Sequence, residues 1–184
     1  MSGAGALDGR DGSPDGQGAP DAGQEASGAR EPASAPPPAG RLLVVTGPMG
    51  PGCHHLAWAM ARHLEESVVL DGPILAGMVA SERASAADEL GAIRTALLRF
   101  CGEIALAETY RRAGYDVVVV DDVADQRLAD FRDLCAPDDV YLVVLDGTEA
   151  TYPGGLHVTS AEDVGALAAS VLARLDEALL PGAA

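Results

Sequence analysis

The residues with the clearest chemistry form a glycine-rich loop, residues 47–52 (GPMGPG). The spacing of Gly47 and Gly52 matches the glycine frame of the phosphate-binding motif G-x-x-x-x-G-K-[ST]. In such loops the glycines allow successive N–H groups to point inward, and the start of the next helix adds partial positive charge. We therefore predict that Gly47, Gly50 and Gly52 belong to an anion-binding loop.

The two side chains that complete the motif are replaced. Cys53 stands where Lys contacts the β- and γ-phosphates, and His54 stands where Ser or Thr binds magnesium. The chain contains no Lys, so within it only an Arg could supply the missing charge. Loss of that charge-assisted contact costs about 1.5–3 kcal/mol in the ground state. The substitutions predict weak or lost nucleotide binding and disfavour ATP-dependent phosphoryl transfer.

Three carboxylates follow apolar runs that predict buried strands. Asp71 comes after residues 67–70 (SVVL), and Asp121 and Asp122 come after residues 117–120 (VVVV). Ligands of parallel α/β sheets bind at the carboxyl ends of the strands, so these side chains are candidates for a site. Asp71 is either functional or the first residue of an Asp-Gly-Pro turn. Asp121 and Asp122 either cap a turn or supply a general base or metal ligands.

Thiol or metal chemistry is an alternative at the start of the predicted helix. A helix N-terminus stabilises a thiolate such as that of Cys53, and His54 or His55 could serve as its base if the fold orients them. The same residues and His63 are of metal-ligand types. Consecutive helical side chains point about 100° apart, which disfavours their convergence on one metal ion.

Other cysteine and arginine side chains have simpler interpretations. Cys101 and Cys135 lie in apolar helical segments and are predicted to be buried. Arg83, Arg94 and Arg127 either line the site or form surface ion pairs with the many carboxylates.

The elements that would position these residues alternate along the chain. Continuous apolar runs predict buried strands, and apolar positions with helical spacing predict helices. Together they predict an α/β fold, with a parallel sheet of about five strands flanked by helices in a single domain. The predicted strands are residues 41–46, 67–70, 117–120, 140–145 and 156–158, and the predicted helices are residues 53–66, 74–81, 84–113, 125–134 and 161–179.

Composition divides the chain near residue 40 and excludes several classes of protein. Residues 1–40 contain nine Gly, nine Ala and six Pro, which predicts a disordered tail before a domain at 41–184. A net charge of −16 argues against nucleic acid and anionic lipid as partners. No apolar run approaches the length of a membrane span, and three widely spaced Cys favour a cytoplasmic setting. An apolar stripe on the last helix is compatible with a dimer or another protein partner.

The order of these motifs resembles that of the P-loop small-molecule kinases among the P-loop NTPases, most closely the chloramphenicol phosphotransferase-like group. The matching segments are residues 42–52 (LLVVTGPMGPG), 68–75 (VVLDGPIL), 116–128 (DVVVVDDVADQRL) and 155–172 (GLHVTSAEDVGALAASVL). The resemblance implies that Asp71 is the general base toward an acceptor hydroxyl. It also implies that Asp121 is the Walker B carboxylate, with Asp122 beside it.

This chain departs from the family at the groups that bind and activate the nucleotide. Besides Cys53 and His54, residues 147–155 contain no Arg where these kinases carry an Arg-bearing lid. Our leading hypothesis is a degenerate P-loop kinase-fold protein that binds a small anionic or phosphorylated molecule weakly and has a binding, regulatory or accessory role. The alternative is a divergent phosphotransferase that uses ATP and Mg²⁺, with Asp71 as base and Asp121 and Asp122 as metal ligands. A third hypothesis keeps the fold and places different chemistry at Cys53 and His54.

Overall fold

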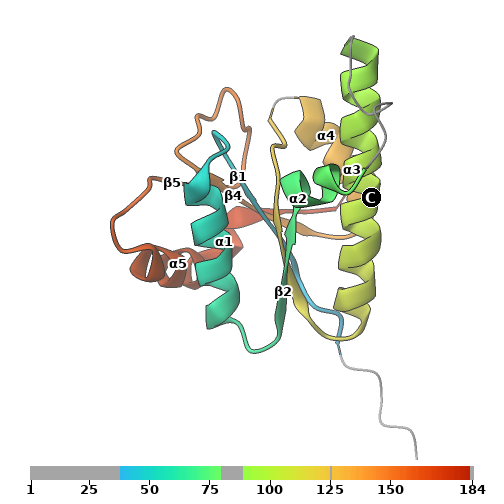
Figure 1. The fold of residues 1–184 in the computed structure, drawn as a ribbon. Coiled ribbons are helices and arrows are strands. Elements are labelled where there is room, and N and C mark those ends of the chain that lie inside the picture. Colours follow the sequence, from blue (N-terminus) through green and yellow to red (C-terminus); the bar gives the residue numbers. More distant parts are fainter. Residues whose placement is uncertain (1–37, 80–88, 125, 183–184) are drawn as a thin grey trace, which may run out of the picture. The chain divides into compact units, whose positions relative to one another are not determined.

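A parallel sheet organises the chain. The structure, a computed structural model, describes residues 38–79, 89–124 and 126–182. The sheet has the strand order β2-β3-β1-β4-β5, and a two-residue strand, β6, pairs antiparallel with the start of β4 (Figure 1). The predicted α/β class is confirmed. The strands are β1 (Leu42–Thr46), β2 (Ser67–Asp71), β3 (Asp116–Val120), β4 (Val140–Leu145), β5 (Leu156–Val158) and β6 (Leu179–Leu180).

Helices cover both faces of this sheet (Figure 1). The apolar side chains of α1 and α5 form one core cluster with Leu43 and Val45, and those of α3 and α4 form a second cluster with Leu42 and Val44. Because β1 is covered on both faces and paired along both edges, all five of its residues are buried. The helices are α1 (Pro51–His63), α2 (Gly72–Gly77), α3 (Glu89–Arg112), α4 (Gln126–Cys135) and α5 (Val164–Ala173).

The last predicted helix is shorter than the sequence pattern indicates. The pattern predicts one helix over residues 161–179, but α5 ends at Ala173 and a 3₁₀ turn, η2 (Leu175–Ala178), follows. Leu179 and Leu180 then leave helical geometry and pair with Tyr141 and Val140 of β4. Helical periodicity carries no information about this long-range pairing, so the sequence analysis missed β6.

The beginning of the described chain is anchored to α3. Gly40 is buried, its N–H donates to the carbonyl of Arg111 at 2.9 Å, and its own carbonyl accepts from Arg111 Nε at 2.7 Å. A Cβ at Gly40 would lie 1.8 Å from the carbonyl oxygen of Tyr115, so the close approach requires glycine. Residues 1–37 of the predicted tail lie outside the described residues, and the boundary after residue 40 stays a prediction.

Among the described residues, no helix combines the length and apolar character that a membrane crossing needs.

The core beneath α3 depends on a pair of phenylalanines. The rings of Phe100 and Phe131 are fully buried and meet edge to face, with centroids 5.3 Å apart. We expect Phe100→Ala to lower the free energy of unfolding by about 3–5 kcal/mol, because it removes this contact and leaves a cavity. Leu98→Ala, at a side chain 66% exposed on the same helix, is the matched control and should change stability by about 0.5 kcal/mol or less. Urea unfolding of both variants measures the difference, and equal effects would contradict the described core.

Candidate functional site at the carboxyl ends of the strands

The glycine-rich loop connects β1 to α1 at the carboxyl edge of the sheet. Gly47 has a φ of +146°, and a Cβ there would lie 2.1 Å from the carbonyl oxygen of Leu145 in β4. Only glycine fits this close approach. Gly50 is the extended N-cap residue of α1, and Pro51 occupies its first turn, where a missing N–H is tolerated. The chain therefore has a tight strand-to-helix turn at the predicted position.

Fewer N–H groups are available in this loop than in one without proline. Pro48 and Pro51 have none, and the backbone of Gly50 forms a hydrogen bond with the thiol of Cys53. The N–H groups of Gly47, Met49 and Gly52 are the other backbone donors of residues 47–52. The backbone of residues 47–52 therefore offers an anion these three groups, beside the N-terminal dipole of α1.

Cys53 points into the core instead of toward the loop. Its side chain is 1% exposed and packs in the cluster that α1 and α5 form against the sheet. Burial raises the pKa of the Cys53 thiol, and the hydrogen bond from Gly50 only partly opposes this effect. A neutral, enclosed thiol is the reverse of what nucleophilic chemistry requires.

His54 contacts the candidate acceptor base. Its Nδ1 lies 2.7 Å from Oδ2 of Asp71, across the gap between the first turn of α1 and the end of β2. The other oxygen of Asp71 accepts from the N–H of Ile74 at 3.0 Å and so caps α2. Asp71 therefore both caps α2 and contacts His54 of α1. The structure brings together two residues that the sequence analysis treated separately.

Asp121 is buried and paired with an arginine of α3. Arg99 Nε donates to Asp121 Oδ2 at 2.6 Å, and the N–H of Asp122 donates to Oδ1 at 2.7 Å. Asp121 is 2% exposed, so both of its oxygens are satisfied within the protein. Arg99 also lies over the ring of Phe100, 5.4 Å from its centroid. A guanidinium therefore occupies one side of the predicted Walker B carboxylate.

Asp122 lies in a more exposed environment and makes different contacts. Its Oδ1 accepts from the N–H of Ala124 at 3.2 Å in a local turn, and its Oδ2 accepts from Arg127 at 3.1 Å. Each of the two adjacent carboxylates therefore has its own cation. Within the described residues, no group of three or more His, Cys, Asp or Glu side chains converges as a metal site.

Glu103 completes a buried cluster that the sequence analysis did not identify. It lies one helical turn after Arg99 on α3 and is fully buried. A Cβ on Gly72 would come within 2.6 Å of both Glu103 Oε1 and Asp121 Oδ2. The residue after Asp71 must therefore be glycine for the ends of β2 and β3 to meet α3 in this way. One sequence signal could have revealed this cluster: Arg99 and Glu103 are a charged pair spaced i, i+4 among the apolar positions of α3.

The carboxyl of Glu103 is neutral at ordinary pH. Burial, a hydrogen bond with Asp121 and the negative charge of Asp121 together raise its pKa from 4.5 to about 9, against a smaller opposing effect of Arg99. As a carboxylate it finds no hydrogen-bond donor for either oxygen within the described residues. As a neutral acid it can donate a hydrogen bond to Asp121 through its O–H. One negative charge, on Asp121, then faces the one positive charge of Arg99.

Other predicted candidates lie outside this cluster. Arg94 is exposed and Arg127 pairs with Asp122, while Arg83 lies outside the described residues. The loop between β4 and β5 is held by His157, whose ring nitrogens contact the carbonyl oxygens of Gly147 at 3.2 Å and Tyr152 at 3.0 Å.

The comparisons with known proteins identify the fold. A scan against protein-family models finds no match, and a search of curated protein sequences also finds none. Solved structures do match. A mutant of the APS kinase CysC from Mycobacterium tuberculosis aligns with a TM-score of 0.60 and 21% identity, over 76% of this chain and 99% of that one. The tunicamycin resistance protein of Deinococcus radiodurans aligns with a TM-score of 0.55 and 15% identity, over 77% and 99%.

A sugar kinase from Janibacter sp. HTCC2649 aligns with a TM-score of 0.53 and 13% identity, over 76% of this chain and 96% of that one. These similarities define the class: the chain has the fold of the P-loop small-molecule kinases. Each match spans nearly the whole of the compared protein, so the resemblance covers the fold and not one shared motif.

The neutral state of Glu103 predicts a specific dependence of stability on pH. Because its pKa is raised from 4.5 to about 9 by folding, the native state holds a proton that the unfolded state releases. This contribution to stability is complete below pH 4.5 and is lost as the pH rises toward 9. We expect Glu103→Gln, which is neutral at all pH values, to flatten the fall in stability across this interval. Denaturant unfolding at several pH values measures it, and parallel curves for the two proteins would contradict a neutral Glu103.

The burial of Cys53 predicts how the native protein reacts with thiol reagents. Cys101 is exposed, contrary to the sequence prediction, because its position on α3 faces away from the sheet, whereas Cys53 and Cys135 are buried. We expect one fast-reacting thiol in the native chain and three after unfolding. Cys101→Ser should abolish the fast phase, and its persistence in that variant would show that Cys53 or Cys135 is accessible.

Proposed function

We propose that the protein is a degenerate P-loop kinase-fold protein that does not transfer phosphoryl groups from ATP and Mg²⁺ and has a binding or regulatory role. The observation that carries the proposal is the pairing of its carboxylates with basic side chains of the same chain. Arg99 Nε lies 2.6 Å from Asp121 Oδ2. His54 Nδ1 lies 2.7 Å from Asp71 Oδ2. In an active kinase of this fold the same carboxylates would face a metal ion and an acceptor hydroxyl.

The Arg99–Asp121 pair supports a site that functions without magnesium. Mg²⁺ binds oxygen ligands in near-ideal octahedral geometry and releases its waters reluctantly. To reach Asp121 it would have to displace a guanidinium from a carboxylate that is 2% exposed. The displaced guanidinium, which is 18% exposed, would then lie largely buried without its partner, and loss of one partner from a fully buried pair costs about 3–5 kcal/mol.

The His54–Asp71 contact supports the same interpretation on the acceptor side. Asp71 Oδ2 lies 2.7 Å from His54 Nδ1 and its Oδ1 accepts from the N–H of Ile74, so an incoming hydroxyl would have to compete with a contact at each oxygen. His54 also replaces the hydroxyl that would bind the metal. The replacement of Ser or Thr by His54 at this motif position therefore affects both the predicted metal site and the predicted base.

The ligand that this geometry favours is a small anionic or phosphorylated molecule bound at residues 47–52 without a metal ion. The remaining loop N–H groups and the N-terminus of α1 are the groups that would contact it. The fold is compatible with ligands of this kind, since the structurally similar APS kinase of Mycobacterium tuberculosis has been solved in complex with AMPPNP and APS. Without the Lys contact we expect the affinity to be low.

Thermal unfolding of the full chain tests the proposal. We expect ATP to raise the unfolding midpoint no more with Mg²⁺ than without it, because Asp121 and Asp122 each already have a cation. A ligand at 100 times its dissociation constant adds about 2.7 kcal/mol, so metal-assisted binding would shift the midpoint by several degrees. His54→Ser, which restores the motif hydroxyl and releases Asp71, is the matched variant and should gain sensitivity to Mg²⁺.

A direct assay of ATP consumption decides between this proposal and the phosphotransferase alternative. Consumption that requires Mg²⁺ and is abolished by Asp71→Asn would overturn the proposal and establish Asp71 as the base. Absence of consumption in the wild type and in Asp71→Asn, with both proteins folded, supports a binding role.

A further inference from the structure

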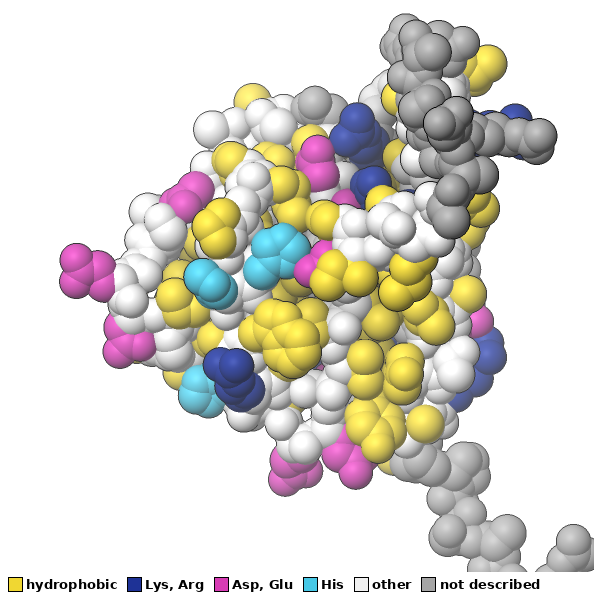
Figure 2. All heavy atoms as spheres, viewed as in Figure 1, with side chains coloured by type: hydrophobic (Ala, Val, Ile, Leu, Met, Phe, Trp, Pro, Cys, Tyr) yellow, Lys and Arg dark blue, Asp and Glu magenta, His cyan; other side chains and the backbone are white. Residues whose placement is uncertain are grey.

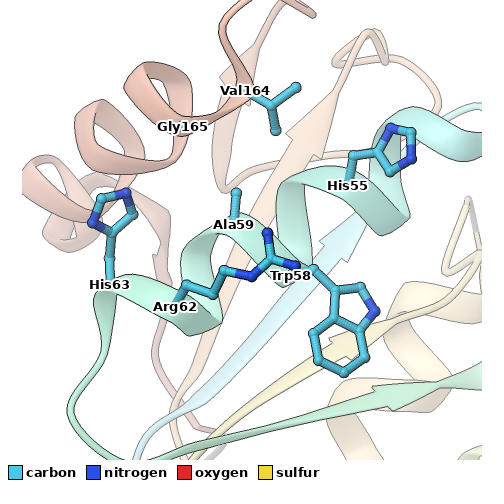
Figure 3. Close-up of a pocket in the computed structure, with 7 residues that line it drawn as sticks. All are labelled: His55, Trp58, Ala59, Arg62, His63, Val164 and Gly165. Atoms are coloured by element: carbon cyan, nitrogen blue, oxygen red, sulfur yellow. The ribbon is translucent and has the colours of Figure 1, made fainter.

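A surface groove lies between α1 and the start of α5. Its volume is about 640 Å³. Figure 3 shows His55 and His63 toward the two ends of α1, with Trp58 and Arg62 between them and Val164 across the groove. None of these residues belongs to the loop at 47–52 or to the buried carboxylate cluster. The groove is lined by His55, Trp58, Ala59, Arg62, His63, Val164 and Gly165.

The groove includes an exposed aromatic side chain, on a face where hydrophobic and His side chains lie close together (Figure 2). Trp58 is the single Trp of the chain and is 51% exposed, although α1 has a buried face on which Leu56 and Met60 pack against the sheet. Ala59 and Val164 extend the apolar surface beside it. A large exposed aromatic side chain within an apolar patch is a common mark of a binding site, because its ring supplies contact area at a low cost in conformational entropy.

The charge of the groove is opposite to that of the chain. The whole chain carries a net charge of −16, yet the residues that line the groove include one Arg, two His and no carboxylate. Arg62 makes no ion pair or hydrogen bond with the other described residues, whereas Arg99, Arg111 and Arg127 each pair with an Asp. Its guanidinium is therefore available to a ligand, with five N–H donors in a planar arrangement.

The start of α5 adds little to this preference for negative charge. Asp163 is the N-cap residue of that helix, and its Oδ1 accepts from the N–H of Ala166 at 2.9 Å. Its negative charge therefore offsets the positive end of the helix dipole.

We propose that this groove binds a small planar aromatic molecule that carries an anionic group, with the ring against Trp58 and the anion on Arg62. The volume is within the range of about 300–1,000 Å³ that is typical of small-molecule sites, and a molecule of mononucleotide size fits it. His55 and His63 supply ring nitrogens that can hydrogen-bond polar edges of the ligand at either end. Aromatic contact and a paired anion are each modest alone, and their combination selects the ligand class.

A pair of matched dyes tests the proposal with the full chain. Anilinonaphthalenesulfonate has an aromatic ring system with an anionic group, and phenylnaphthylamine has the same rings without it. Since Trp58 is the single Trp, energy transfer from Trp to a bound dye reports proximity to this position. We expect saturable binding of the sulfonate with energy transfer, and binding of the neutral dye that is at least about threefold weaker, a value within the range for loss of an exposed charge contact.

Substitutions locate the dye. We expect Arg62→Ala and Arg62→Gln to weaken sulfonate binding by about three- to tenfold, the effect of one partly exposed charge-assisted contact, and to leave the neutral dye unchanged. Arg62 is exposed, so both variants should unfold at the wild-type temperature. Ile74→Ser, at an exposed apolar side chain of α2, is the control and should bind the sulfonate as the wild type does.

Three results would overturn the proposal: no sulfonate binding, equal affinity for the two dyes, or sulfonate binding that is insensitive to Arg62 and lost in Ile74→Ser. The last result would place the dye on the apolar surface of α2. The test involves neither ATP nor Mg²⁺ and no residue of the loop. Its outcome is therefore independent of the proposed function.

Discussion

Arg99 and Asp121 form a buried ion pair at the point where α3 crosses the carboxyl ends of β2 and β3. Their contact is 2.6 Å long, and the raised pKa of Glu103, one turn further along α3, leaves one negative charge for one positive charge. Gly72 allows the approach, since any side chain there would collide with Asp121 and Glu103. The positions of Asp71, α2 and the turn after β3 all depend on this arrangement. Loss of either charge would leave the other buried without compensation.

The same pairing gives the site its chemical character. A P-loop kinase places a Lys side chain and a metal ion around the phosphates. In this chain the positive charges next to the carboxylates are side chains, and the Lys position is occupied by a buried thiol. Under the proposed function, groups that would act on a substrate instead stabilise one another. The fold of the P-loop small-molecule kinases is retained because its requirements are met by the apolar strands and the glycines of the loop, which these substitutions do not alter.

Arg side chains supply the permanent positive charge of this acidic chain, because it contains no Lys. Several described Arg side chains form an ion pair with a nearby carboxylate, as Arg41, Arg111 and Arg174 do. Arg62 does not, and it lies beside the exposed ring of Trp58 on the face of α1 that is turned away from the sheet. On one helix, therefore, His54 is used to complete the interior of the candidate site, while Arg62 and Trp58 remain available to solvent and to ligands. The two faces of α1 serve different purposes.

The sequence by itself determined the order of strands and helices, because continuous valine-rich runs and helical periodicity are local properties. It also determined the glycine frame at residues 47–52, the replacement of the Lys and of the Ser or Thr, and the resemblance to P-loop kinases. It predicted Asp71 and Asp121 as site candidates from their places after buried strands. Only the tertiary structure decided that His54 pairs with Asp71, that Arg99 and Glu103 join Asp121, that Cys53 is buried, and that Leu179 and Leu180 form a strand. These facts depend on contacts between residues far apart in the chain, and neither residue type nor spacing encodes such contacts directly.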